Sequence, residues 1–308
     1  VYVDGKKVID AWTEHSVQMD EAMIKLEAGK TYKLQVEYFD NGGDCFAGLY
    51  WKAPSAGSQN VLARFGDAGK VAAECDVTVA VLGINKSIER EGQDRFSLEL
   101  PVDQQEFIKE LYKVNPNTVV VLVAGSSMAV NWMDENVPAI LNAWYPGEQG
   151  GNAVAEVLFG DYNPGGRLPL TYYNSLDEIP AFDNYFVKGR TYQYFEGQPL
   201  YEFGYGLSYT KFRYKSKGVN VEQDTVKVSF EVSNTGKYDG DEVTQVYVKY
   251  PETGTYMPLK QLHGFKRVHI KKGKTSKVTI GVPKKDLRYW DEQERKFVTP
   301  KGEYTFMV

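Results

Sequence analysis

The sequence predicts an α/β sandwich domain with a mostly parallel sheet, flanked on each side by a β-sandwich. Near-continuous apolar runs at 77–83, 118–125 and 139–145 are typical of strands that are buried on both faces. Helical periodicity follows two of these runs, as in alternating strand and helix layers. Before about residue 52 and after about residue 212, apolar and polar residues alternate instead, which is typical of sandwich strands.

Residues 1–52 are predicted to form β-structure. The clearest strand covers 30–40 and places four side chains on one face: Tyr32, Leu34, Val36 and Tyr38. The glycines at 41–43 predict a turn, and 46–51 is predicted to return as the next strand. A stretch rich in Pro, Ala, Gly and Ser at 53–60 then predicts a linker.

Two helices are predicted in the central region. The first covers 102–114 and stops before Pro116, because the residue before a proline is biased away from the helical conformation. The second covers 150–160 and ends at Gly160, a residue that favours the left-handed helix end. Six residues form their predicted apolar faces: Phe107, Ile108, Leu111, Val154, Val157 and Leu158.

The last hundred residues predict an immunoglobulin-like or fibronectin-III-like sandwich. Amphipathic strands are predicted at 226–232, 244–250, 276–282 and 303–308, and turns at 234–236, 271–273 and 300–302.

Composition excludes several classes of function. A chain of 308 residues predicts more than one domain, and its net charge of −5 offers no basic surface for nucleic acid. No apolar run is long enough to cross a membrane. We expect Cys45 and Cys75 to be ordinary buried thiols, since a disulfide-stapled module has more cysteines.

Motifs for metals and nucleotides are also absent. There is no HExxH, CxxC, GxSxG or Walker sequence, and we expect surface or partly buried roles for His15, His263 and His269. The glycine cluster at 146–152 precedes a helix, yet it lacks the GxGxxG order of a phosphate loop. We therefore predict no metal and no cofactor.

One loop, 84–101, combines charge with a favourable position. It follows the first predicted parallel strand, and ligands of open α/β sheets bind beyond the carboxyl ends of strands. Glu89, Glu91 and Asp94 alternate with Arg90 and Arg95. Such a run is commonly a solvated surface loop, whereas two neighbouring acids flanked by arginines also suit proton transfer. Composition leaves both interpretations open.

The sequence EGQDR followed by SLELP resembles the acid/base loop of glycoside hydrolase family 3, and GINKSIEREGQDR most resembles its β-xylosidase branch. The resemblance continues through NPNTVVVLVAGS, AILNAWYPGEQGGNAVAEVLFGDYNPGGRLPLTYY, GRTYQYF and PLYEFGYGLSYTKF, and covers about 75–212. Residues 1–52 resemble the second half of a PA14 domain, and residues 213–308 resemble the family's fibronectin-III-like tail.

The resemblance implies three domains: a partial PA14-like domain at 1–55, the α/β sandwich at 56–211 and the fibronectin-III-like domain at 212–308. In the family the α/β layer packs against an amino-terminal barrel that supplies an Asp nucleophile. The sequence begins like the middle of a domain and has no nucleophile motif. We therefore expect that barrel to be a missing partner, and we expect this chain alone to be inactive.

The resemblance also implies site residues. Glu91 corresponds to the acid/base, Glu89 is the alternative, and Asp94 and Arg95 are expected to hold the shape of the loop. Trp144 and Tyr145 are candidates for substrate binding, evenly balanced against a packing role. Three further residues are weaker candidates for sugar contact: Trp12, Phe46 and Arg190. For Arg190 and the tyrosines of 189–195 we favour a structural role.

The implied function is that of an exo-acting retaining β-glycosidase acting on an oligosaccharide or aryl β-glycoside, with xylose the expected sugar and an extracellular or periplasmic location. A β-glucosidase is the first alternative. A non-catalytic carbohydrate-binding module is the second, although a binder has no need of a proton donor. A flavodoxin-like nucleotide-binding domain is the third, and the missing phosphate loop argues against it.

Overall fold

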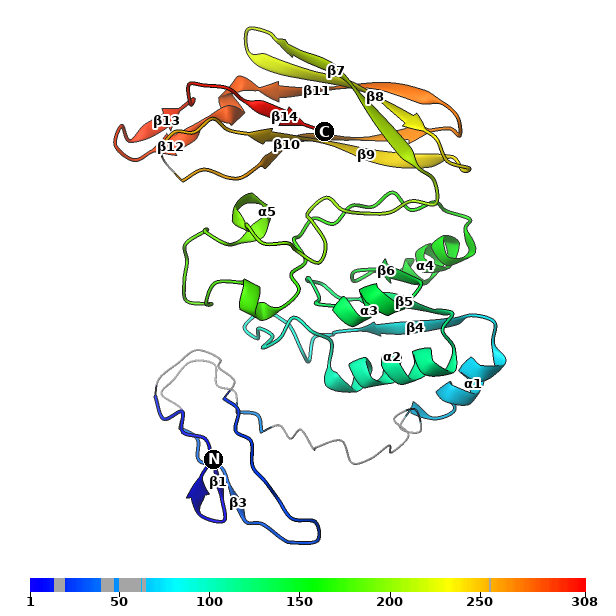
Figure 1. Cartoon of the computed structure of the whole chain (residues 1–308), viewed down its shortest axis with the longest axis vertical. Coiled ribbons are helices and arrows are strands. Elements are labelled where there is room, and N and C mark those ends of the chain that lie inside the picture. Colours follow the sequence, from blue (N-terminus) through cyan, green and yellow to red (C-terminus); the bar gives the residue numbers. More distant parts are fainter. Residues whose placement is uncertain (14–19, 40–46, 50–61, 63–64, 255) are drawn as a thin grey trace. The chain divides into compact units, whose positions relative to one another are not determined.

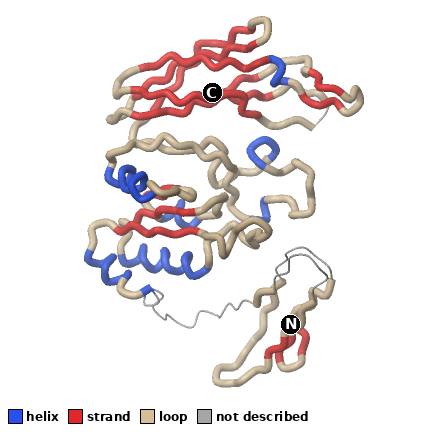
Figure 2. The backbone as a smooth tube through the Cα atoms, turned by 180° about the vertical axis from the view of Figure 1, so that it is seen from behind, coloured by secondary structure: helices blue, strands red, loops and turns tan. Residues whose placement is uncertain are grey.

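The computed structural model describes residues 1–13, 20–39, 47–49, 62, 65–254 and 256–308. These residues form two compact units, one of residues 1–120 with 137–139 and one of residues 121–136 with 140–308 (Figure 1). Loops take up much of the first unit before residue 68, whereas long strands dominate the end of the chain (Figure 2).

The first residues form a small antiparallel sheet in the order β2-β1-β3, from β1 (Tyr2–Val3), β2 (Lys6–Lys7) and β3 (Leu34–Gln35). Asp4 and Gly5 both have positive φ, of 49° and 79°, which suits the tight turn between β1 and β2.

The longer strand predicted over 30–40 is wrong beyond the two residues of β3. Leu34, Val36 and Tyr38 are exposed by about half, because no second layer covers them among the described residues. Residues 47–49 are not in a strand, so the prediction for 46–51 also fails where it can be followed. The turn at 41–43 and the linker at 53–60 lie outside the described residues.

The central region alternates strands and helices, as predicted. A parallel sheet has the order β4-β5-β6. Its elements along the chain are α1 (Ala68–Glu74), β4 (Thr78–Gly83), α2 (Val102–Val114), β5 (Thr118–Val123), α3 (Asn131–Asn136), β6 (Ala139–Asn142) and α4 (Gly150–Phe159). Helix α2 has the predicted bounds and lies along β4 in both views (Figures 1 and 2). Helix α4 ends at Gly160, whose φ of 83° is left-handed.

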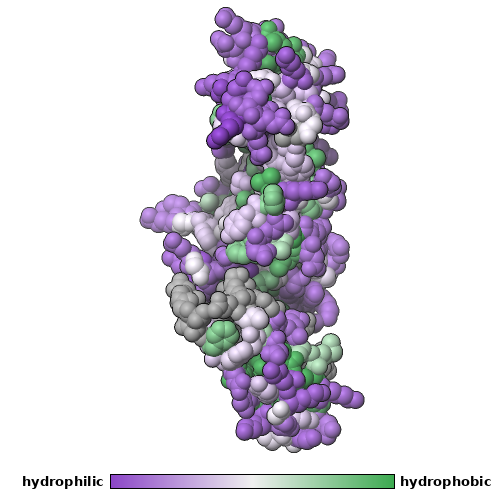
Figure 3. All heavy atoms as spheres, turned by 90° about the vertical axis from the view of Figure 1, so that its left-hand side faces the viewer, coloured by the Kyte–Doolittle hydropathy of each residue, from purple (hydrophilic) through white to green (hydrophobic). Residues whose placement is uncertain are grey.

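Burial differs between the strands of this sheet. The prediction of burial on both faces is confirmed for β5, where Val120, Val121 and Leu122 are at most 1% exposed. It is wrong for β4, where Val79 and Val81 are 45% and 66% exposed although Leu82 is buried. Strand β4 is at the edge of the sheet, and only one of its faces is covered within the described residues. Figure 3 shows apolar side chains, in green, among the hydrophilic ones on one face of the molecule.

Cys75 is exposed, so the prediction that it is a buried thiol is wrong. It follows the last residue of α1 in a surface turn, where no core reaches its side chain. Cys45 and His15 lie outside the described residues.

A long connection joins α4 to the last domain and contains η2 (Leu176–Glu178) and α5 (Thr191–Tyr194). The guanidinium of Arg190 donates hydrogen bonds to the backbone carbonyls of Pro180, Ala181 and Asn184. The Tyr192 ring stacks on Phe203, with the ring centroids 4.1 Å apart. These contacts hold the connection together and agree with the structural role expected for 189–195, which stays a prediction.

The last domain is a sandwich of two antiparallel sheets with the orders β10-β9-β14 and β11-β8-β7. Its elements are β7 (Phe212–Val221), β8 (Thr225–Asn234), β9 (Gly240–Lys249), β10 (Gln261–Ile270), β11 (Thr275–Pro283), η3 (Lys284–Leu287), β12 (Tyr289–Asp291), β13 (Lys296–Val298) and β14 (Thr305–Met307). Inward residues of both sheets form the core, among them Val228, Phe230, Val246 and Val248. The strands predicted at 226–232 and 276–282 lie within β8 and β11, and 244–250 coincides with β9 up to Lys249. Of the strand predicted at 303–308, only β14 (Thr305–Met307) forms. None of the helices in the described part of the chain has the length and apolar character needed to cross a membrane.

Candidate active-site loop

The charged loop lies directly after β4 and leads into α2. Its two ends are anchored in the core by Ile84 and Leu100, which are 4% and 2% exposed. The backbone of Gly83 exchanges two hydrogen bonds of 2.8 Å with the side chain of Gln104 on α2. The loop therefore starts and finishes on a fixed base, at the carboxyl end of β4.

The first part of the loop is a turn held by Asn85. Its side-chain oxygen accepts hydrogen bonds from the backbone N–H and the hydroxyl of Ser87, at 2.8 and 2.6 Å. Its backbone carbonyl accepts from the N–H groups of Ile88 and Glu89. This is the local side-chain turn for which Asn is favoured, and the Asn-x-Ser spacing was the sequence signal for it.

A second turn carries Glu91. Arg90 and Gln93 exchange two backbone hydrogen bonds, of 3.1 and 3.0 Å, which leaves Glu91 and Gly92 at the tip. Gly92 has a φ of 72°, a conformation that glycine adopts without steric cost. The Gln93 amide donates to the Ser87 carbonyl at 3.1 Å and so ties the second turn to the first. Glu91 is exposed at this tip.

Glu89 has a different environment. Its carboxylate accepts a hydrogen bond of 2.6 Å from the guanidinium of Arg95, whose side chain is only 8% exposed. The shape-holding role predicted for Arg95 agrees with this ion pair. Asp94 is exposed, and the described residues show no hydrogen bond to its carboxylate that would give it the same role.

Trp144 and Tyr145 follow β6. Trp144 is half-buried and has a φ of 55°, which is unusual for a bulky side chain. The Tyr145 ring lies against the backbone of Gly125, where a Cβ atom would be 2.4 Å from ring atom Cε2. In the same way, a Cβ atom at Gly150 would be 2.6 Å from the Cβ atom of Pro146. The two residues that follow Trp144 are thus each packed closely against a glycine.

Trp12 is 57% exposed and packs against Phe39, with ring centroids 4.9 Å apart, whereas Phe46 lies outside the described residues. His263 is half-buried on β10, and His269 on the same strand bonds to Asp241 at 2.7 Å. No group of three or more metal-binding side chains occurs in the residues that the structure describes.

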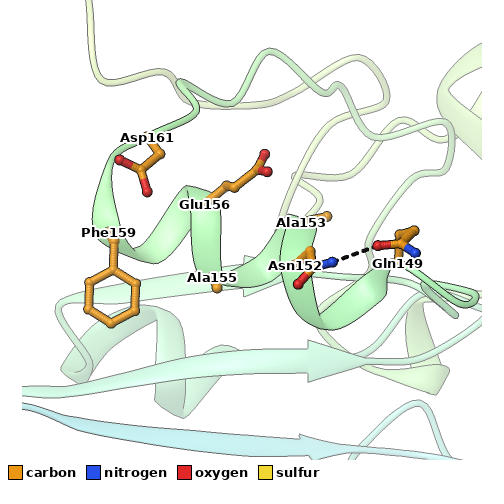
Figure 4. A pocket seen from close by; sticks show the side chains of 7 residues that line it. All are labelled: Gln149, Asn152, Ala153, Ala155, Glu156, Phe159 and Asp161. Atoms are coloured by element: carbon orange, nitrogen blue, oxygen red, sulfur yellow. Dashed lines mark hydrogen bonds between the residues drawn. The ribbon is translucent and has the colours of Figure 1, made fainter.

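A hollow of about 410 Å³ lies along α4 (Figure 4). Seven residues line it: Gln149, Asn152, Ala153, Ala155, Glu156, Phe159 and Asp161. It contains none of the predicted site residues. Asn152 donates to Gln149 at 2.6 Å, and no basic side chain is present to hold a phosphate.

The chain was compared with known proteins. Residues 11–209 match the C-terminal domain of glycosyl hydrolase family 3, and residues 242–308 match a fibronectin type III-like domain. The fold is therefore that of the C-terminal part of a glycosyl hydrolase. The chain belongs to glycosyl hydrolase family 3, as its loop sequence predicted. The match begins within the segment predicted as PA14-like, and that assignment stays a prediction.

Relatives in the family have two kinds of name. The chain is 42% identical over 218 residues to a xylan 1,4-β-xylosidase of Xylanibacter ruminicola, covering 70% of this chain and 25% of that protein. It is 33% identical over 285 residues to a periplasmic β-glucosidase of Salmonella typhimurium, covering 87% and 37%.

A crystal structure of a β-glucosidase from Kluyveromyces marxianus with glucose has a TM-score of 0.71 and 36% identity, covering 77% of this chain and 30% of that one. The chain spans 25% to 41% of the length of the curated relatives it matches.

Proposed function

We propose that the chain is the carboxyl-terminal part of an exo-acting retaining β-glycosidase, in which Glu91 is the acid/base. The observation that supports this proposal is the exposed position of Glu91 at the tip of a hydrogen-bonded turn, beyond the carboxyl end of β4. In this proposal the nucleophile is an Asp of a barrel domain outside these 308 residues, and the PA14-like, α/β and fibronectin-like domains have the boundaries 1–55, 56–211 and 212–308.

The chemistry needs two carboxyl groups and water. The Glu91 carboxylic acid donates its proton to the glycosidic oxygen while the bond from C1 to that oxygen breaks. The nucleophile carboxylate forms a bond to C1 and gives a glycosyl-enzyme ester. The Glu91 carboxylate then takes a proton from water, and the resulting hydroxide attacks C1 and releases the nucleophile.

Replacing Glu91 in the complete enzyme tests this role. Glu91→Ala is expected to lower turnover by about 10²–10⁴-fold on substrates with poor leaving groups, and much less on activated aryl glycosides, which scarcely need protonation. Added azide is expected to restore turnover of activated substrates, because it attacks the glycosyl-enzyme without help from a base. If Glu89→Ala shows this profile and Glu91→Ala does not, Glu89 is the acid/base.

For the sugar, we propose a terminal β-linked xylose. The xylan 1,4-β-xylosidase relative supports it, and the β-glucosidase relatives support glucose equally. The two sugars differ by one hydroxymethyl group, which a pocket discriminates by filling or leaving that space. The kcat/KM for an aryl β-xyloside divided by that for the β-glucoside decides between them. A ratio below one makes the enzyme a β-glucosidase and leaves the role of Glu91 untouched.

Two further parts of the proposal concern contacts and location. Trp144 and Tyr145 contact the substrate, supported by their position after β6 and the close packing of Tyr145 against a glycine. The enzyme acts outside the cytoplasm, in an extracellular or periplasmic location. The periplasmic β-glucosidase among the relatives supports that location. Fractionation of the source cells with an activity assay on each fraction tests it.

A further inference from the structure

We propose that Glu89 and Arg95 are a positioning pair that presents Glu91 to the substrate, and that neither of them transfers a proton in the reaction. This inference rests on the proposed function, because it defines a role relative to Glu91. It gives different roles to two glutamates that are only two positions apart, of which the sequence favoured Glu91 as the acid/base and kept Glu89 as the alternative.

The pair joins two points of the loop on either side of Glu91. The Arg95 Nε–H donates to Glu89 Oε2 at 2.6 Å, with the two side chains 8% and 26% exposed. A hydrogen bond between opposite charges is strengthened where water is largely excluded. Because the pair joins Glu89 to Arg95, it holds both ends of the segment that carries Glu91.

The turn between Glu89 and Arg95 has hydrogen bonds of its own. Two backbone hydrogen bonds close it between Arg90 and Gln93, and the Gln93 side chain bonds to the Ser87 carbonyl. The seven-residue segment from Glu89 to Arg95 is therefore closed at its base by the ion pair and again beneath its tip by the turn. These contacts fix the backbone that carries Glu91, while its side chain is exposed.

The two carboxyl groups differ in what they offer to a substrate. The Glu89 oxygen is already an acceptor for a buried guanidinium, whereas a general acid must donate a proton. Glu91 is exposed at the tip, and within the described residues no hydrogen bond or ion pair occupies its carboxylate. Glu89 thus suits the task of holding the loop and Glu91 the task of meeting the leaving oxygen.

The test compares Glu89→Gln, Arg95→Met and the double variant in the complete enzyme. Each single variant is expected to lower kcat/KM for a poor leaving group by about 10–100-fold, the scale of a displacement near 1 Å. The double variant is expected to be no worse than the poorer single variant, because each single variant already removes the same ion pair. Arg95→Lys, which keeps the charge, is expected to recover part of the loss.

The pH–rate profile distinguishes a positioning role from proton transfer. Glu89→Gln is expected to keep the alkaline limb of the profile, because the proposed proton donor is still present, whereas Glu91→Gln is expected to lose it. The exposed pair Glu110–Lys113 on α2, at 2.6 Å, is the matched control. Glu110→Gln and Lys113→Met are expected to leave kcat/KM unchanged. Thermal unfolding of each variant establishes that it is folded, and Arg95→Lys replaces Arg95→Met if the latter is not.

Three results would overturn the inference in distinguishable ways. Wild-type rates in both folded single variants, or losses that multiply in the double variant, remove the positioning role and leave Glu91 as the acid/base. Loss of the alkaline limb in Glu89→Gln makes Glu89 the proton donor and overturns both proposals. A wild-type profile in Glu91→Gln overturns the proposed function itself.

Discussion

Arg167 and Glu242, which are 75 positions apart in the sequence, form an ion pair whose side chains are only 12% and 9% exposed. The other oxygen of the Glu242 carboxylate accepts a hydrogen bond of 2.6 Å from the Tyr214 hydroxyl. Burial raises the pKa of Tyr214 well above its ordinary value, and the bond to Glu242 adds to this effect. The connection after α4 is thereby joined to strands β7 and β9 through one carboxylate.

Removing one member of this pair is expected to be costly. Glu242→Leu or Arg167→Met leaves a buried charge uncompensated and is expected to lower the free energy of unfolding by about 3–5 kcal/mol. The double variant is expected to recover most of that loss. Urea denaturation measures all three. The exposed pair Lys296–Glu294 is the control, where Glu294→Gln is expected to cost no more than about 1 kcal/mol. A Glu242→Leu protein as stable as the control would contradict this.

His263 is expected to make the protein less stable in mild acid. Its burial lowers its pKa below the ordinary value, and its Nε2 lies 2.8 Å from the hydroxyl of Tyr250, whose own pKa burial raises to about 12. The folded state therefore binds the His263 proton less well than the unfolded state. This stability is complete above the unfolded pKa of about 6.5 and is lost as the pH falls through the folded pKa.

The slope from this one group is at most about 1.4 kcal/mol per pH unit. It is measured as the difference between wild type and His263→Gln in urea denaturation between pH 7.5 and 5, roughly the range that spans the ordinary histidine pKa. Parallel stability curves for the two proteins would show that His263 does not contribute.

The backbone conformation of Trp144 is expected to lower the stability of the protein. Its φ of 55° costs a non-glycine residue about 1–2 kcal/mol. Trp144→Gly is therefore expected to be more stable than Trp144→Ala by about 1 kcal/mol, since both lose the ring and only one relieves the strain. If the ring contacts the substrate, both variants are expected to raise KM in the complete enzyme. Equal stability of the two would show that the backbone relaxes when the ring is removed.

The isolated 308-residue chain is expected to fold, to be inactive and to self-associate. The proposed function places the nucleophile outside these 308 residues, so we expect no activity. The residues around β5 and in the fibronectin-like domain form buried cores, so we expect the chain to fold. Val79 and Val81 on the edge strand β4 are exposed, and such edges promote association. Circular dichroism, aryl glycoside assays and sedimentation check the three parts. Val81→Lys is expected to reduce association, and normal enzymatic rates would refute the inactivity.

The sequence correctly predicted those elements whose apolar residues are buried in the structure. Helix α2 and strand β5 appear where the apolar residues placed them, because both faces of β5 and one face of α2 are packed. The strand predicted over 30–40 and the burial of β4 were wrong for the opposite reason, since apolar alternation does not say whether a covering layer exists. Cys75 was misjudged in the same way.

The site was predicted less completely than the fold. The resemblance singled out Glu91 and Glu89, and the charge run marked their loop. Which glutamate pairs with Arg95 depends on the backbone turn at Gly92, and no spacing rule states it. Asn85 and Gln93 were missed because their hydrogen bonds go to nearby backbone and side-chain groups rather than to a motif partner.

The contacts of the connection after α4 have a consequence for anyone who builds chimaeras from this family. The glycine at Gly204 lies so close to β9 that a Cβ atom would be 2.3 Å from Gln245 Oε1. Together with Arg167–Glu242, this couples residues on both sides of the apparent boundary at 212. A chimaera that replaces only the residues after 212 takes the two sides of each contact from different parent proteins. Exchange of the tail together with the segment from about residue 160 keeps those partners in one parent, and such hybrids are the ones expected to melt in a single transition.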